Sequence, residues 1–148
     1  MDNLNTIKTE DFWNPEHIVE KFWNGLAEGK VYGRKCKECG AIEFPPHLAC
    51  NECGYHETEW VELSGKGTLK SFVFTGILNA RLELEDKGVK YVCGEVQLEE
   101  GPSINAIILG ISKKKGREIE PKLPLPVKPV FFDMGRYTTL FFELDEEN

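Results

Sequence analysis

The feature that most constrains this chain is a set of four cysteines arranged in two pairs. Cys36 and Cys39 form the first pair, and Cys50 and Cys53 the second, in the pattern Cys-x2-Cys-x10-Cys-x2-Cys. A pair with this spacing binds one metal ion from a single tight turn, and two pairs complete a tetrahedral site of four thiolates. Because protein ligands then fill every coordination position, the pattern predicts a structural rather than a catalytic metal centre.

We expect this site to hold one Zn²⁺ per chain. Gly40 and Gly54, which follow the two pairs, suit the tight turns because glycine adopts positive φ at little cost. A segment of about 25–30 residues buries too little apolar surface to fold alone, so the metal must supply most of its stability. Iron is the first alternative, because similar cysteine turns bind both ions. A redox dithiol is the second.

Composition and charge narrow the classes of function. The chain has 148 residues, of which 41% are hydrophobic and 29% charged, as in an ordinary globular protein. Its net charge of −7 argues against general nucleic-acid binding, which needs clustered Lys and Arg. The uncharged stretches are shorter than the ~20 residues that a membrane helix needs, and the N-terminus lacks the apolar segment of a secretory signal. We therefore expect a cytoplasmic protein, in which thiols stay reduced.

Before the cysteines, residues 1–30 contain one predicted helix. Asn14 is a suitable N-cap, Pro15 suits the first helical position, and Gly29 is a suitable end. The apolar face of this helix comprises Ile18, Val19, Phe22, Trp23 and Leu26. Its spacing indicates packing against the chain's own core. The alternative is a docking surface for a partner subunit, because large apolar faces on small domains often mark interfaces.

After the cysteine segment, residues 31–59, the chain changes character. Over residues 60–148, β-branched and aromatic runs alternate with turn signals, among them Glu99-Glu100-Gly101-Pro102 and Met134-Gly135-Arg136. We expect strands over 60–63, 68–77, 90–98, 103–111, 127–133 and 137–144. With no convincing helix among them, they predict a small antiparallel barrel. Residues 80–88 are predicted to form a long loop or a short helix.

Several of these motifs together resemble one known family. They are the helix, the two cysteine pairs, Phe44-Pro45-Pro46 between the pairs, and the Leu-Ser-Gly-x-Gly-Thr element at residues 63–68. From about Phe22 to about Phe132 the chain is similar to the zinc-ribbon and OB-fold family of acyl-CoA-associated proteins. The resemblance implies a mainly β protein with an N-terminal helix, a rubredoxin-like zinc ribbon and a C-terminal OB-fold barrel.

The resemblance also implies a function. Family members are partner subunits of thiolases, of 3-hydroxy-3-methylglutaryl-CoA synthases, and of steroid-CoA hydratase or aldolase systems. Within the family, this chain looks most similar to the small zinc-finger subunits of benzoylsuccinyl-CoA thiolases. We therefore expect a non-catalytic subunit of a hetero-oligomer, which docks on a thiolase-fold catalytic subunit and helps to bind acyl-CoA or CoA. A single-stranded nucleic-acid-binding protein is the alternative, since both modules occur in such binders.

Residues outside the cysteine pairs are candidates for these contacts. The candidates for CoA binding are Lys113, Lys114, Lys115 and Arg117. This basic cluster suits the CoA phosphates, and a solvated hairpin tip is the alternative. The candidates for partner docking are Phe22, Trp23 and His47. His47 stands where family members usually carry Arg after the paired prolines, and a surface histidine is the alternative there.

Cys93, the one cysteine outside the pairs, is predicted to be a packing residue. A catalytic thiol needs an activating histidine, and all three histidines of the chain lie within its first sixty residues. Strand alternation places Cys93 on one face with Tyr91 and Glu95. The carboxylate pairs Glu99-Glu100 and Glu146-Glu147 lie at a turn and in the tail, where we expect them to be solvated.

Overall fold

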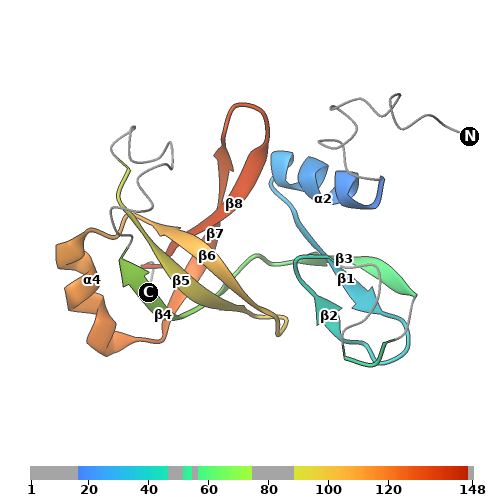
Figure 1. The fold of residues 1–148 in the computed structure, drawn as a ribbon, viewed down its shortest axis with the longest axis horizontal. Helices are drawn as coiled ribbons and strands as arrows, with labels where there is room; N and C mark the ends of the chain where they lie inside the picture. The colour runs from blue at the N-terminus through green and yellow to red at the C-terminus, as the bar shows by residue number, and fades with distance from the viewer. Residues whose placement is uncertain (1–16, 47–51, 55–56, 75–88, 147–148) are drawn as a thin grey trace, which may run out of the picture.

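The computed structural model describes residues 17–46, 52–54, 57–74 and 89–146. Figure 1 shows a small three-stranded sheet and a barrel side by side, with the helix α2 above the sheet. The elements are α2 (His17–Ala27), β1 (Val31–Cys36), β2 (Ile42–Glu43), β3 (Thr58–Leu63), β4 (Gly67–Phe74), β5 (Tyr91–Leu98), β6 (Ser103–Leu109), α4 (Lys113–Ile119), the 3-10 turn η3 (Glu120–Lys122), β7 (Leu125–Asp133) and β8 (Thr138–Leu144). The predicted fold class, mainly β with an N-terminal helix, is confirmed.

The smaller sheet has the strand order β2-β1-β3 and carries the cysteine turns. Strand β3 pairs with β1 along its whole length, from Val31 opposite Leu63 to Cys36 opposite Thr58. Residues 60–63 therefore extend the cysteine-bearing sheet, whereas the sequence analysis assigned them to the barrel. The expected boundary after residue 59 falls inside β3. Alternating apolar residues identify a strand but do not specify which strand it pairs with. Here Val31 of β1 and Leu63 of β3 pair with each other, and both side chains are buried.

The larger sheet closes into a barrel with the strand order β4-β5-β6-β8-β7. Neighbouring strands are antiparallel except β6 and β8, and the pairing of β4 with β7 closes the ring. Five strands in this order, with a helix between the third and the fourth, form an OB-fold barrel. The turns predicted at residues 99–102 and 134–136 join β5 to β6 and β7 to β8, as expected.

The helix α4 was not expected, since we found no convincing helix among the predicted strands. Ser112 is its N-cap, and the Ser112 Oγ accepts a hydrogen bond from the backbone N–H of Lys115 at 3.1 Å. Ile119 and Gly116 are buried against the barrel, where Gly116 lies against the rings of Phe72 and Phe74. The basic cluster is therefore part of a packed helix and not of a solvated hairpin tip.

One hydrophobic core includes residues of α2, the small sheet and the barrel. Phe22 and Leu26 of α2 belong to it together with Val31 of β1 and Leu69 of β4. The helix ends before Gly29, which has a φ of +78° as its predicted role requires. The expected N-cap and the segment 80–88 lie outside the described residues. Among the described residues, no helix is both long and apolar enough to cross a bilayer.

Candidate functional site

Three of the four predicted metal ligands converge at the end of β1. The Sγ atoms of Cys36, Cys39 and Cys53 all lie within 4.8 Å of one another, and those of Cys36 and Cys53 are 3.7 Å apart. A tetrahedral zinc site with Zn–S bonds of about 2.3 Å places its sulfur atoms about 3.8 Å apart. The three thiols therefore fit a single thiolate-bound metal ion. Cys50 lies outside the described residues.

The local backbone shapes the cysteine turns and favours the thiolate form of Cys36. Gly40 and Gly54 both have a φ of +76°, as the tight turns require, and the Gly40 N–H donates to the Cys36 carbonyl at 3.1 Å. A hydrogen bond from the backbone of Cys39 lowers the pKa of the Cys36 thiol to about 7, although burial acts in the opposite direction. Because the thiolate is the form that binds metal, this backbone prepares Cys36 as a ligand.

The aromatic residues of α2 divide into an internal one and a surface one. Phe22 is only 9% exposed and packs edge-on against Phe44, with ring centroids 5.8 Å apart. Trp23 is half-buried, and its ring lies 5.5 Å from that of the exposed Tyr137 in the β7–β8 hairpin. Phe22 therefore belongs to the core, and of the two docking candidates that the structure describes, Trp23 is the one that reaches the surface. His47 lies outside the described residues.

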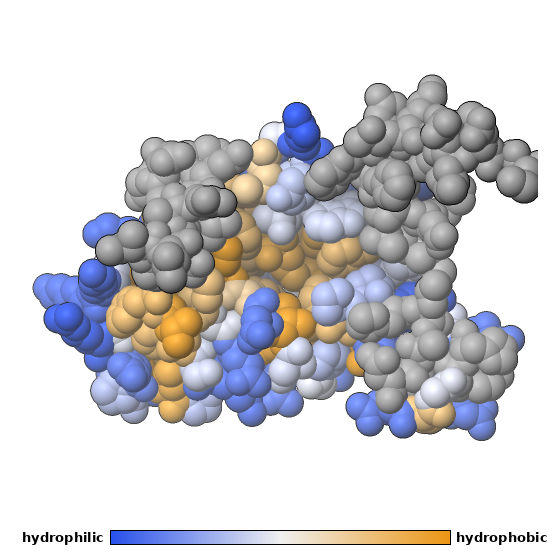
Figure 2. Space-filling view, viewed as in Figure 1, coloured by the Kyte–Doolittle hydropathy of each residue, from blue (hydrophilic) through white to orange (hydrophobic). Residues whose placement is uncertain are grey.

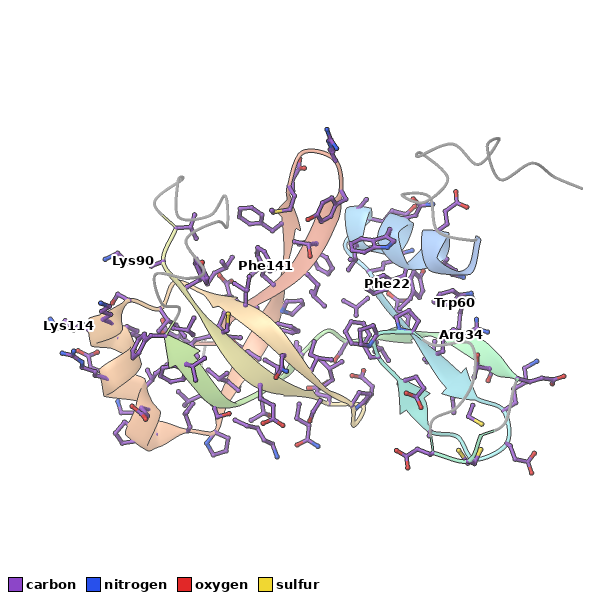
Figure 3. All side chains as sticks on the ribbon, viewed as in Figure 1. Phe22, Arg34, Trp60, Lys90, Lys114 and Phe141 are labelled. Atoms are coloured by element: carbon purple, nitrogen blue, oxygen red, sulfur yellow. The ribbon has the colours of Figure 1, made fainter. Side chains whose placement is uncertain are left out.

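The small sheet carries a cationic and aromatic cluster that the sequence analysis missed. Arg34 donates from Nη2 to the carbonyl and from Nε to the hydroxyl of Thr58, at 2.7 and 2.9 Å, and its guanidinium carbon lies 4.6 Å from the centre of the Trp60 ring. Figure 3 shows Arg34 beside Trp60 at the β1–β3 pair. Lys21 Nζ lies 5.0 Å from the centre of the Tyr32 ring. The register of β1 and β3 brings Arg34 to Trp60, and the packing of α2 on the small sheet brings Lys21 to Tyr32; no sequence pattern gives either.

In the basic cluster on α4, three cations are exposed and the fourth forms an ion pair. Lys115 Nζ lies 2.7 Å from Glu146 Oε1, an ion pair that raises the pKa of Lys115 and lowers that of Glu146. Glu146 is exposed, as expected, and in addition pairs with Lys115. Lys113, Lys114 and Arg117 are exposed on α4. Figure 3 places Lys114 at the opposite end of the molecule from Arg34 and the cysteine turns.

The other carboxylate pair holds the connection between the small sheet and the barrel. Ser64, between β3 and β4, donates from its backbone N–H to Glu100 Oε2 at 2.8 Å and from Oγ to Glu99 Oε2 at 2.9 Å. The Glu99 N–H donates to the Lys66 carbonyl at 3.1 Å. Both carboxylates thus have a structural role. Glu99 is exposed, as expected, whereas Glu100 is half-buried.

Cys93 lies on the outer face of the barrel. The strand registers place it between Val73 of β4 and Ile107 of β6, and its side chain is half-buried. As strand alternation predicted, it lies on the face of β5 that carries Tyr91 and Glu95, away from the barrel core that contains Val92 and Val96. Both neighbours in register are apolar, which agrees with a packing role.

Comparison with known proteins gives a consistent picture. The profile of the ChsH2 rubredoxin-like zinc ribbon domain matches residues 23–59. A DUF35 domain-containing scaffold protein of Methanocaldococcus jannaschii is 32% identical over 96 residues, which are 64% of this chain and 66% of the relative. A protein of the same name from Methanothermobacter thermautotrophicus is 32% identical over 104 residues, which are 70% of this chain and 71% of the relative. The benzoylsuccinyl-CoA thiolase subunit BbsA of Thauera aromatica is 38% identical over 61 residues, which are 41% of each chain.

A solved structure shares the fold over most of this chain. The Ltp2-ChsH2(DUF35) aldolase structure superposes with a TM-score of 0.64 at 22% identity, covering 85% of this chain and 93% of the matched one. At that identity the likeness shows the fold. The relatives, the ribbon profile and the fold confirm the resemblance inferred from the cysteine turns and the Leu-Ser-Gly-x-Gly-Thr element. The chain belongs to the DUF35 family of scaffold proteins with a zinc ribbon.

Proposed function

We propose that this protein is a non-catalytic subunit of a hetero-oligomeric enzyme that makes or breaks carbon–carbon bonds in acyl-CoA thioesters. The observation that carries the proposal is the convergence of the ribbon thiols on one point, in a chain related to scaffold proteins. Thiols committed to holding a metal are unavailable as nucleophiles. BbsA, a thiolase subunit by name, and the aldolase that contains ChsH2 support the class of reaction.

The proposed cofactor is one structural Zn²⁺, held by Cys36, Cys39, Cys50 and Cys53. The spacing of the three described thiols and the depressed pKa of the Cys36 thiol support it. Bound there, zinc would stabilise the turns that complete the small sheet. The ion would take no part in the reaction, since the four thiolates close its coordination shell.

The proposed catalytic partner is a thiolase-fold chain that supplies its own nucleophile and base, with thiolysis of benzoylsuccinyl-CoA as the specific reaction. Trp23 on α2, which is half-buried beside the exposed Tyr137, is proposed to contact that partner. Lys113, Lys114 and Arg117 on α4 are proposed to meet CoA phosphates, because clustered cations are suited to these groups. The proposed compartment is the cytoplasm, in which the ribbon thiols stay reduced.

The test compares the isolated chain with its complex. The tagged chain should copurify from its native source with a chain that mass spectrometry identifies as thiolase-fold. The isolated chain should neither cleave nor condense acyl-CoA, whereas the complex should be active. Cys93→Ala should retain most of that activity, because Cys93 packs between apolar neighbours. Turnover by the isolated chain, or specific binding of single-stranded oligonucleotides in place of a catalytic partner, would overturn the proposal.

A further inference from the structure

In a closed barrel, successive residues of a strand point alternately into the barrel and out of it. The inward residues here are apolar and fully buried, as in Val92, Val96, Ile108 and Phe142. The outward residues should be polar wherever they meet water. Departures from that rule on the outer face therefore indicate a surface that contacts something other than water.

One row of outward residues breaks this rule on every strand of the barrel. We call it the barrel belt: Val73 of β4, Cys93 of β5, Ile107 of β6, Phe141 of β8 and Val130 of β7. Val73 is paired with Cys93, Cys93 with Ile107, and Phe141 with Val130. The pairing of Ile108 with Phe142 places Ile107 beside Phe141. The barrel belt is thus continuous across all five strands.

Further apolar residues widen the barrel belt on one side. Tyr91, Leu109, Phe132 and Met134 form one cluster with its members Phe141, Ile107 and Val130. Val73 is 68% exposed, whereas Phe141 and Tyr91 are 8% and 6% exposed and the other members are half-buried. Figure 2 shows hydrophobic residues gathered across this face of the molecule, between α4 and α2.

The opposite half of the same outer face is polar. Beyond Cys93 the outward residues of β5 are Glu95 and Gln97, and beyond Ile107 those of β6 are Asn105 and Ser103, which pair with them. The same strands are therefore apolar at one end and polar at the other. The barrel fold alone does not require outward residues to be apolar at one end of a strand and polar at the other. An interface that covers only the apolar end would account for this difference.

We propose that the barrel belt is the docking surface for the catalytic subunit, an inference that rests on the function proposed above. The belt crosses five strands, a width of about 19 Å at the usual strand spacing. That width suits the surface of a folded protein better than a single extended peptide. The barrel is closed, so its strands offer no edge to which a peptide could pair.

Charge favours a different protein over a second copy of this chain. Two copies would bring together net charges of −7 each, and like charges oppose association. The proposed partner therefore presents an apolar patch on a chain that is less acidic than this one. Exposed Tyr137, which contacts Trp23, continues the surface from the β7–β8 hairpin to α2.

Val73→Lys tests the proposal, because this exposed side chain can be changed without disturbing the core. The probe is the catalytic chain identified above, produced separately, and the measurement is its dissociation constant by calorimetry. A lysine buried in an apolar interface should weaken binding at least about tenfold. Ser103→Lys is the matched control, since it adds the same charge at the exposed polar end of β6. It should leave the affinity within about twofold.

Alkylation of Cys93 by N-ethylmaleimide supplies a second readout. In the complex, Cys93 should react at least about tenfold more slowly than in the isolated zinc-loaded chain. Unchanged affinity of Val73→Lys, together with unprotected Cys93, would overturn the docking surface while leaving the subunit proposal intact. Failure of the unmodified chain to bind would overturn the subunit proposal itself. Two further outcomes, each with normal affinity for the partner, would also overturn the inference. A changed oligomeric state of isolated Val73→Lys would mean that the barrel belt binds a second copy of this chain. A lowered melting temperature would mean that the barrel belt packs within this chain.

Discussion

At the scale of single residues, the cysteines differ in whether they need a bound metal ion. Cys36 is 1% exposed, and its thiol pKa is lowered to about 7 by the Cys39 backbone. A buried thiolate without a counter-ion is costly, so a metal ion is needed to balance it. Cys93, on the outer face of the barrel, has no such requirement.

The purified protein should therefore contain about one zinc ion per chain. Cys36→Ser or Cys53→Ser should lose the metal and unfold the small sheet, because metal binding in such sites supplies folding free energy. Elemental analysis and circular dichroism measure the two effects. Cys93→Ser is the control and should keep both zinc and fold. Folded protein without metal would contradict the prediction, and red protein with visible charge-transfer bands would identify iron.

The ion pair between Lys115 and Glu146 should make a pH-dependent contribution to stability. The pKa of Glu146 is lowered and that of Lys115 is raised, so the pair stabilises the fold between these two values. The stabilisation should disappear as pH falls through the lowered Glu146 pKa, and as pH rises through the raised Lys115 pKa. Both side chains are exposed, so the effect should be small.

Glu146→Gln should accordingly lower the melting temperature slightly at pH 7, and its difference from the unmodified chain should shrink below about pH 4.5. Comparing two chains at each pH cancels the acid-induced loss of metal, which affects both. Glu120→Gln, at an exposed position of η3, serves as the control and should show no such pattern. A difference that persists undiminished in acid would mean that Glu146 acts through packing.

At the scale of the elements, β4 and β5 meet at Gly94. A Cβ at this position would lie 2.6 Å from Leu69 Cδ1 and 2.8 Å from the backbone oxygen of Ser71, where the register shifts between Leu69 and Ser71. The backbone cannot move without opening the barrel. Gly94→Ala should therefore destabilise the chain by about 1–3 kcal/mol in chemical denaturation with zinc present. Cys93→Ala, the outward neighbour, should cost much less; equal losses would contradict this account.

The helix α2 should show a different response at each of its two aromatic residues. Phe22 is in the core and contacts Phe44, so Phe22→Ala should destabilise the isolated chain by roughly 3–5 kcal/mol. Trp23→Ala, at the surface beside Tyr137, should cost less stability and should weaken assembly with the catalytic subunit. Thermal melting and gel filtration separate the two effects. Unchanged stability of Phe22→Ala would contradict its place in the core.

Sequence patterns predicted where helices and strands occur better than which elements pack or pair with one another. The first cysteine turn, the two hairpin turns and the alternation of β5 are local signals, and each is confirmed; the second cysteine turn lies partly outside the described residues. The helix α4 was missed because it has only seven residues with a glycine among them, too short for a clear helical pattern, whereas packing of Gly116 against Phe72 and Phe74 favours it. Strand β3 was assigned to the barrel because no local signal specifies pairing with β1.

The same limit applies to the candidate sites. Ligand spacing along the chain is local, so the convergence of Cys36, Cys39 and Cys53 was predictable. The stacking of Arg34 on Trp60 and the continuous barrel belt depend on strand register, which long-range packing sets. The link from Lys115 to Glu146 joins residues 31 positions apart, and only the closed barrel brings them together.

At the scale of the whole molecule, the cysteine turns and the basic helix α4 lie at opposite ends (Figure 3). The Ser64 hydrogen bonds to Glu99 and Glu100 fix the strand connection between those ends, and α2 packs on both parts. The proposed docking surface lies between α4 and α2, so the proposed partner seated on it would bring its bound ligand close to α4. This arrangement leads to a prediction about α4.

Joint change of Lys113, Lys114 and Arg117 to Gln should raise the KM of the complex for acyl-CoA and leave kcat nearly unchanged. Contacts with the remote CoA phosphates act equally on the ground state and the transition state, so their loss weakens binding alone. The salt dependence of KM should also become flatter, because added ions screen exposed phosphate contacts. Lys115 is left unchanged, since its pairing with Glu146 helps to hold α4.

The control removes positive charge from the other end of the molecule. Lys35→Gln with Lys37→Gln, both at exposed positions near the cysteine turns, should leave KM and its salt dependence unaltered. If α4 holds the partner and not CoA, the triple variant should instead lose activity on dilution and regain normal kinetics once the complex is saturated. Unchanged KM at every salt and protein concentration would show that the three cations of α4 are only solvated, and would contradict their assignment to CoA.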